Sequence, residues 1–303
     1  MNDYIKKKPI SLLIPLILIG LVIILFYAIL PIYANYGDAS VLDYAMNSWN
    51  AETGYEHGYL VIPLMILFAF YGMQKIKTGP VRPSILGIAP LILGIGLYVL
   101  SVRTIQPRLA LFAFPFITIG IIYFNFGWRV AKHFLFPAFF LYFAITLPGL
   151  QQATNSLQLM VTKFCDVLSN WVGIETIIRG NNIESATGAW DDLKIAEGCS
   201  GIRSIVALTM ISAIYAMYTQ NKLWKKWFIF ACALPIAIFT NALRIFTIIV
   251  IAEMGYGEFA AGVYHDYTGL VVFFPAALLC LFVIDKRINA RDNKKKVVKT
   301  VMK

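Results

Sequence analysis

The chain has 303 residues, of which 59% are hydrophobic and only 14% are charged, and its formal net charge is +10. Soluble globular domains carry roughly 25% charged residues, so charges this sparse, gathered between long apolar runs, exclude a water-soluble fold and indicate a membrane protein. The basic excess does not indicate a nucleic-acid partner, because the positive residues lie where membrane topology places them.

The long apolar runs predict an all-α polytopic membrane protein that forms a single integral membrane domain, 1–303. A spanning helix needs about 20 mostly apolar residues. The first run follows a lysine cluster and is too long for the apolar part of a signal peptide, so we interpret it as a retained anchor. The sequence supplies about eight candidate transmembrane helices: 10–32, 58–74, 83–102, 109–126, 134–150, 200–219, 227–251 and 267–284.

The distribution of basic residues predicts the orientation of these spans. Most of the 26 Lys and Arg residues fall in loops on one side of the arrangement, and positive loops stay in the cytoplasm. We therefore expect both the N- and C-termini to be cytoplasmic, with the chain integral to the cell (inner) membrane. Residues 286–303 form a basic cytoplasmic tail that we expect to be disordered.

The largest segment on the opposite side, 151–199, is long enough to form structure of its own. Its first part has apolar residues at helical spacing, among them Val161 and Phe164, which predicts an amphipathic helix lying on the membrane or on the bundle. A turn at Gly180 and short β-prone stretches predict a ribbon after it. We thus expect a small extracytoplasmic helix-plus-β-ribbon insertion, with strands near 174–178, 183–185 and 193–197.

Reactive residue types fall at the outer ends of three predicted spans. Cys199 lies at the start of the sixth, Arg244 near the outer end of the seventh, and His265 just before the eighth. Since these ends share one depth on one side of the membrane, we predict that the three side chains meet there as catalytic residues at the extracytoplasmic face.

Each of these residue types suits acyl transfer. The unpaired N–H groups at a helix start stabilise a thiolate, which makes Cys199 the candidate nucleophile. The backbone amides at Ser200 and Gly201 can form an oxyanion hole. His265 can act first as base and then as acid, and Arg244 can hold a thiolate, an oxyanion or a substrate carboxylate.

Three further residues are candidates for support. Asn241 lies three residues before Arg244 and can orient it. Arg203 lies one helical turn after the cysteine, although pairing with a nearby acidic residue equally explains it. His57 precedes the second span and can also cap it. A membrane arginine can simply reach the interface, but a charge inside an apolar helix is costly and needs a reason.

The remaining cysteines give no sign of a metal or redox centre. Cys165, Cys232 and Cys280 complete a set of four with no CxxC or zinc-type spacing. Cys232 and Cys280 lie inside apolar runs, which predicts buried small hydrophobic residues. We expect neither a metal nor a cofactor, and the role of Cys165 stays open.

Three short motifs resemble a known family. The stretch 197–204 (Glu-Gly-Cys-Ser-Gly-Ile-Arg-Ser) resembles the cysteine motif of the exosortase/archaeosortase family, and 241–245 and 265–269 resemble its arginine and histidine motifs. The stretch 56–58 (Glu-His-Gly) resembles a Ser-His-Gly stretch at the start of its second helix, with Glu56 in place of serine. The resemblance covers nearly the whole chain.

This resemblance implies a membrane-embedded cysteine protease or transpeptidase. Its protein substrates would carry a C-terminal sorting signal, made of a PEP-CTERM-like motif, a transmembrane helix and a basic tail. The enzyme would transfer the cleaved protein to a lipid or cell-surface acceptor. By position, Cys199 would be the nucleophile, Arg244 the charge stabiliser and His265 the general base or acid.

Two other functions stay open at this point. One is a thiol protease that only hydrolyses its substrates. The other is a transporter or export factor for surface polysaccharide or lipid-linked sugar, which would require polar residues at mid-bilayer and broken helices. The substrate motif, the acceptor and the oligomeric state cannot be derived from the sequence.

Overall fold

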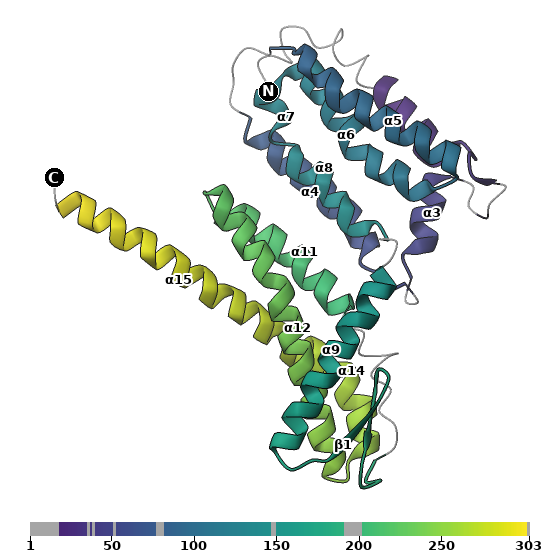
Figure 1. Cartoon of the computed structure of the whole chain (residues 1–303). Coiled ribbons are helices and arrows are strands. Elements are labelled where there is room, and N and C mark those ends of the chain that lie inside the picture. The colour runs from purple at the N-terminus through teal and green to yellow at the C-terminus, as the bar shows by residue number, and fades with distance from the viewer. Residues whose placement is uncertain are drawn as a thin grey trace. The chain divides into compact units, whose positions relative to one another are not determined.

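The computed structural model describes residues 18–34, 37, 40–50, 53–76, 82–146, 150–190 and 202–301. Helices make up most of these residues (Figure 1). Contacts divide the chain into two compact units, Met1–Leu147 and Pro148–Lys303, and each unit is described by itself.

The first unit is built from helices, two of them short 3₁₀ turns (η3 and η4). It begins with a helix over Leu18–Ile29 that ends in a π-helical turn, η1 (Leu25–Ile29). The other elements are α3 (Val41–Ser48), α4 (Gly58–Gln74), η3 (Ile85–Gly87), α5 (Ile88–Thr104), α6 (Pro107–Phe126), α7 (Trp128–Ala131), α8 (Leu135–Phe140) and η4 (Leu141–Ala144).

Helices α5 and α6 form a closely packed antiparallel pair. A Cβ atom on Gly120 would lie 2.7 Å from the backbone nitrogen of Leu91, and one on Gly94 would lie 2.7 Å from Ile117. Small residues let helix backbones approach closely where lipid supplies no hydrophobic force between them. Gly94 and Gly120 therefore allow the close approach of α5 and α6.

The second unit carries the remaining elements, and α12 runs through its centre. The elements are α9 (Leu150–Trp171), β1 (Thr176–Arg179), β2 (Asn182–Ser185), α11 (Ile202–Thr219), α12 (Leu223–Glu253), α13 (Gly257–Phe259), η5 (Ala260–Tyr264), α14 (His265–Thr268), η6 (Gly269–Phe273) and α15 (Phe274–Val301). The segments η5 and η6 are π-helical.

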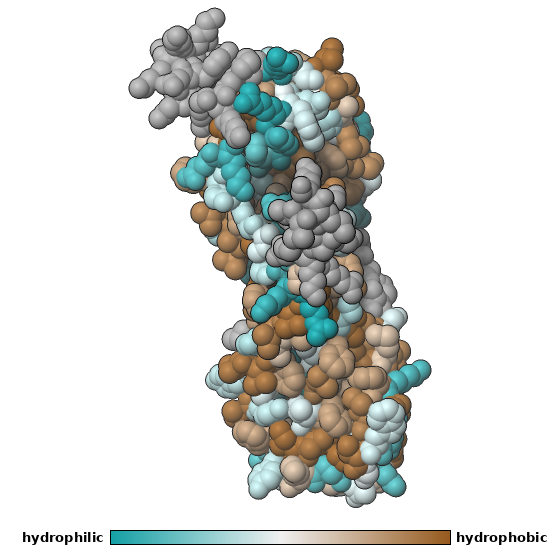
Figure 2. Space-filling view, turned by 90° about the vertical axis from the view of Figure 1, so that its left-hand side faces the viewer, coloured by the Kyte–Doolittle hydropathy of each residue, from teal (hydrophilic) through white to brown (hydrophobic). Residues whose placement is uncertain are grey.

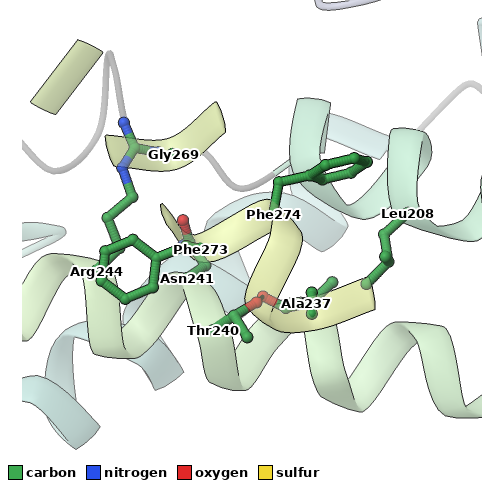
Figure 3. Close-up of a pocket in the computed structure, with 9 residues that line it drawn as sticks. Leu208, Ala237, Thr240, Asn241, Arg244, Gly269, Phe273 and Phe274 are labelled. Atoms are coloured by element: carbon green, nitrogen blue, oxygen red, sulfur yellow. Dashed lines mark hydrogen bonds between the residues drawn. The ribbon is translucent and has the colours of Figure 1, made fainter. Parts of the chain in front are cut away.

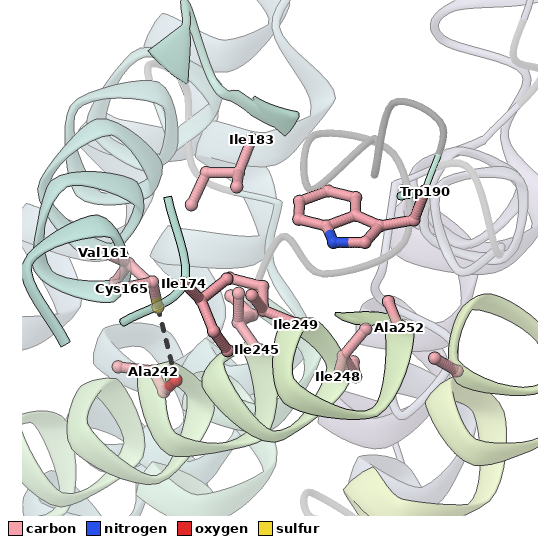
Figure 4. Close-up of a cluster of buried hydrophobic side chains, with 11 residues drawn as sticks. Val161, Cys165, Ile174, Ile183, Trp190, Ala242, Ile245, Ile248, Ile249 and Ala252 are labelled. Carbon is pink, nitrogen blue, oxygen red and sulfur yellow. Dashed lines mark hydrogen bonds between the residues drawn. The ribbon is translucent and has the colours of Figure 1, made fainter. Parts of the chain in front are cut away.

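Two apolar clusters pack along α12. The N-terminal half, with Ile229, Ala233 and Ala237, packs with residues of α11 and α15. The C-terminal half, from Ala242 to Ala252, packs with α9, the strands and Trp190 (Figure 4). The residues between these clusters, Thr240 and Asn241, are where the candidate site begins.

Strands β1 and β2 pair antiparallel, with Ile178 opposite Ile183. The turn between them contains Gly180 at a φ of 63°, a conformation that glycine adopts without strain. Ile183 is fully buried in the cluster on α12, so the hairpin is fastened to the helix that carries Arg244. The third stretch predicted as a strand, 193–197, lies outside the described residues.

The described helices have the length and apolarity of a membrane protein. Three are long and apolar enough to span a bilayer: Ile85–Thr104, Pro107–Phe126 and Leu223–Glu253. Four shorter apolar helices accompany them: Leu18–Ile29, Gly58–Gln74, Leu135–Ala144 and Ile205–Thr219. The count of eight spans stays a prediction.

Hydrophobic side chains are also exposed in large numbers, and Figure 2 shows brown hydrophobic areas over much of one face. Soluble proteins rarely expose apolar patches of this extent. Cys280 is exposed, so the predicted burial of this residue was wrong. Cys232 is half-buried. An apolar residue in a spanning helix can face acyl chains as readily as a neighbouring helix.

One predicted span differs in form. The run 134–150 is not one helix, because α8 ends at Phe140, η4 continues as a 3₁₀ turn, and Ile145 is extended with φ −94° and ψ 121°. The β-branched residues Ile145 and Thr146 and the following Pro148 all disfavour a continued helix. This interruption was not anticipated from hydropathy.

The C-terminal part also differs from prediction. Helical structure runs from Gly257 to Val301, so the prediction of a disordered tail was wrong for the residues up to Val301. No glycine or proline follows Pro275, and the tail is rich in good helix formers. Buried Asp285 also accepts hydrogen bonds from Tyr215 at 2.8 Å and Gln220 at 2.5 Å, which fastens α15 to the end of α11.

Candidate functional site

Arg244 joins two segments that are distant in sequence. Its side chain is only 9% exposed, and its Nη2 atom donates a hydrogen bond of 2.5 Å to the carbonyl oxygen of His265. Arg244 lies on α12 and His265 opens α14. Two of the three predicted catalytic residues are therefore adjacent, and the contact uses the backbone of the histidine.

Gly269 lies directly beneath the guanidinium group. A Cβ atom at this position would lie 3.0 Å from Cζ of Arg244 and 3.1 Å from its Nη1. Figure 3 shows the arginine rising from α12 to the segment that contains this glycine. Because Gly269 comes one helical turn after His265, the same helix supplies both a carbonyl partner and an open surface for the arginine.

A small pocket lies beside the arginine. Its lining includes Thr240, Asn241, Arg244, Gly269 and Phe273 (Figure 3), and its cavity volume is about 20 Å³. A single water molecule needs about 10–15 Å³ by this measure, so the pocket admits one water or one small polar group.

The guanidinium keeps hydrogen-bonding capacity in this position. Its Nε atom is buried and has no hydrogen-bond partner among the residues that the structure describes. An unsatisfied buried donor costs roughly 1–3 kcal/mol. A further acceptor bound at Nε would remove this cost.

The helix that carries His265 is irregular on both sides of it. π-Helical turns η5 and η6 flank α14, and Gly262 leaves the helical region with φ −98° and ψ −105°. π-Helical turns often occur at functional sites because they redirect side chains and carbonyl groups. The His265 side chain is half-buried.

Asn241 lies on the same helix as Arg244, three residues earlier, and is buried. Both side chains line the pocket. Whether Asn241 supports Arg244, as the sequence suggested, stays a prediction.

The predicted nucleophile is not part of the described structure. Cys199, Ser200 and Gly201 lie outside the described residues, and only the backbone of Arg203 is described, in the first turn of α11. The predicted meeting of Cys199 with Arg244 and His265 therefore stays a prediction.

His57 belongs to the first unit and makes contacts within it. Its Nε2 bonds to the carbonyl oxygen of Phe143 at 2.8 Å, and its ring lies against Tyr55. It makes no side-chain cap of α4. Burial lowers the pKa of His57, which the Phe143 carbonyl and nearby Glu56 partly offset. The histidine thus fastens the start of α4 to the end of η4, which is a structural role.

Comparison with known protein families shows to which family this chain belongs. The family described as transmembrane exosortase matches residues 49–283, which is well over half of the chain. The chain belongs to the exosortase family. Comparisons with curated proteins and with solved structures gave no match.

The exosortase match includes every candidate residue, from His57 to His265. Exosortases are a family of membrane cysteine transpeptidases, and together with the apolar helices the match identifies an integral membrane protein. Among the described residues, no group of three or more His, Cys, Asp or Glu side chains could hold a metal ion.

Two residues that contribute to the geometry of this candidate site were missed by sequence reasoning. Gly269 ends the histidine motif and lies one turn after His265, and that spacing was a usable signal. Cys165 also gains a role, since its Sγ donates to the carbonyl oxygen of Ala242 at 3.4 Å (Figure 4). It fixes α9 to α12 two residues before Arg244.

Proposed function

We propose that this chain is a membrane-embedded cysteine transpeptidase that cleaves C-terminal sorting signals at the extracytoplasmic face. Its substrates are membrane-anchored proteins with a PEP-CTERM-like motif, one transmembrane helix and a basic tail. The cleaved protein is transferred to a lipid or surface acceptor. The observation that carries this proposal is the contact between Arg244 and His265 beside a pocket, in a chain of the exosortase family.

The length of α12 supports a site near one membrane boundary. Between Trp227, which follows a lysine pair, and Arg244, the helix rises about 26 Å. The hydrocarbon core of a bilayer is about 30 Å thick. If the lysines mark the cytoplasmic end, the arginine lies near the opposite interface, where both a lipid-anchored substrate and water can reach it.

The proposed reaction proceeds through a thioester. His265 accepts the proton of the Cys199 thiol, and the sulfur attacks the carbonyl carbon of the scissile peptide bond. Arg244 stabilises the negative oxygen that develops. The C–N bond then breaks, and His265 returns the proton to the departing amine. An acceptor amine or hydroxyl next attacks the thioester, loses its proton to His265 and regenerates the thiol.

The substrate's own membrane anchor explains why no deep cleft is needed. A protein held by one transmembrane helix presents its scissile bond at a fixed height and diffuses in two dimensions, which raises its effective concentration. A small pocket that holds one polar group is sufficient when the membrane does the positioning.

Gly269 offers a test of the arginine's geometry. Replacing it by alanine would push on the guanidinium, because the new methyl group would lie about 3.0 Å from Cζ. We expect the rate of substrate cleavage to fall by about ten- to a hundredfold, since small misplacements of catalytic groups are costly. The matched control is Gly257→Ala, where the new Cβ would meet only Trp190 at 3.7 Å and the rate should stay near wild type.

The direct test of the proposal is product analysis. The purified protein is reconstituted in lipid vesicles with a membrane protein from the same source that ends in a short motif, an apolar helix and a Lys/Arg cluster. Mass spectrometry should find this protein shortened at the motif and joined through its new carboxyl end to an added lipid extract.

Two other outcomes would revise or overturn this. A free carboxylate at the new end, with lipid present, would identify a hydrolase instead of a transferase. No cleavage of any such protein, with the enzyme folded and inserted, would contradict the enzyme and favour transport.

A further inference from the structure

Helix α9 buries several polar side chains beside Val161. The side chains of Gln158, Thr162, Cys165 and Ser169 are all buried and follow helical spacing. Three of them find partners: Gln158 accepts from Asn181 at 2.9 Å, Thr162 donates to the Asn181 carbonyl, and Cys165 donates to the carbonyl of Ala242. The face turned to the hairpin and α12 is therefore held by hydrogen bonds.

The opposite side of α9 is exposed and apolar. Met160 is 52% exposed, Phe164 42%, Val167 48% and Trp171 80%. These positions follow the spacing i, i+4, i+7 and i+11, so they form one continuous stripe along the helix. We call these four residues the apolar stripe. The sequence had assigned Phe164 to the same face as Val161, but Val161 is buried and Phe164 is exposed.

A third side of α9 is exposed and mostly polar, with Leu159 as its one exposed apolar residue in the described part of the helix. Asn155, Lys163 and Asn170 are exposed, and on a helical projection they lie between the apolar stripe and the buried face. The helix thus presents three environments around its circumference: protein on one side, an apolar surface on the second and a polar surface on the third.

A helix surrounded by water on its outer side would not expose the apolar stripe in this way. A helix on the surface of a soluble protein buries its apolar face, because burial is worth about 25 cal/mol per Å² of apolar surface. In α9 the apolar stripe is left outside while polar residues are buried. The reversal is expected where the outer medium of that stripe is hydrocarbon.

The neighbours of α9 indicate that this hydrocarbon is the lipid bilayer. The helix packs on the C-terminal half of α12, which is long enough to span a bilayer in an integral membrane protein. The elements that pack around such a helix can face lipid on their outer sides. A tryptophan at the end of the stripe, here Trp171 beside Asn170, is typical of the membrane–water boundary.

We propose that the apolar stripe of α9 is inserted into lipid at the boundary of the bilayer, with Lys163 and Asn170 turned to water. Helix α9 then lies in the interface instead of spanning the membrane, as amphipathic helices of this kind do. The hairpin and Trp190, which pack in the same cluster, are held at the membrane surface by this contact. The proposal goes beyond the enzymatic function and does not depend on it.

Nitroxide labels test the three environments directly. Single cysteines replace Phe164, Val167, Lys163 or Asn170 in a background of Cys199→Ser, Cys232→Ala and Cys280→Ser. The buried Cys165 is kept, and the background without a new cysteine shows whether it takes up label. Each protein is reconstituted in vesicles of phosphatidylcholine and phosphatidylglycerol, and circular dichroism confirms that it is folded.

Collision rates with oxygen, which concentrates in lipid, and with a water-soluble nickel chelate are then compared. We expect the oxygen-to-nickel ratio at Phe164→Cys and Val167→Cys to be several-fold higher than at Lys163→Cys and Asn170→Cys. Equal ratios at all four positions would overturn the proposal. Immobile labels at the stripe that neither reagent reaches would also overturn it, because they would indicate that a second copy or another protein covers the stripe.

Discussion

Replacing Cys199 by alanine is expected to abolish processing of the substrate while the protein stays inserted and abundant. Without the sulfur no thioester can form, and His265 and Arg244 have no nucleophile to assist. Loss of a nucleophile typically lowers the rate by on the order of 10⁴-fold or more. An uncleaved precursor with all three parts of its sorting signal should accumulate in the membrane fraction, where immunoblotting detects it.

The other cysteines supply matched controls for this experiment. Cys280 is exposed on α15, so Cys280→Ala makes the same chemical change away from the proposed site and should process the precursor normally. Cys199→Ser is expected to be inactive too, because a hydroxyl is a much poorer nucleophile than a thiolate. If Cys199→Ala still processes the precursor at the normal rate, the thiol mechanism is wrong.

The membrane character of the fold follows from sequence because it depends on composition over long windows. The predicted run 109–126 and the observed α6, Pro107–Phe126, differ by two residues at one end. Hydropathy reports how much apolar surface a segment carries. It does not report where a helix stops, so the extended backbone at Ile145 and the helical tail escaped prediction.

The sequence predicted that Arg244 and His265 meet, but not through which atoms they do so. Both residues were expected near one boundary because two spans end there. The guanidinium binds the backbone carbonyl of His265, and π-helical turns lie on both sides of α14. Hydropathy and motif spacing do not indicate such turns, so this backbone geometry could not be predicted.

His57 shows that a motif alone does not assign a role to a residue. Its motif suggested support for the catalytic residues, while its hydrogen bond to Phe143 explains its position within the first unit. Gly58 is explained in the same way, since a Cβ there would lie 2.3 Å from the Trp49 ring. Packing accounts for both residues of this motif, and the sequence does not separate it from the supporting role of His57, which stays a prediction.

Replacing Arg244 by lysine is expected to lower kcat/KM for cleavage by about 10²- to 10³-fold, the usual cost of removing a donor that stabilises an oxyanion. Lysine keeps the charge but loses the planar group with several donors in fixed directions. An ammonium group that bonds to the His265 carbonyl has no second donor in the position of Nε, and it lacks the flat surface that lies on Gly269. The rate is measured with a reconstituted enzyme and a membrane-anchored reporter.

A structural role for the arginine predicts a different pattern, so two further variants separate the cases. Arg179→Lys makes the same change on the exposed hairpin, where the arginine pairs with Glu184, and should leave the rate unchanged. Arg244→Ala opens space beside the pocket, and added guanidinium ion should restore part of kcat if the group acts on the reaction. If the arginine is merely structural, its loss lowers thermal stability and guanidinium does not restore the rate. Either of two results would exclude Arg244 as the charge stabiliser. One is a nearly normal rate for Arg244→Lys, and the other is an Arg244→Ala variant that guanidinium stabilises but does not reactivate.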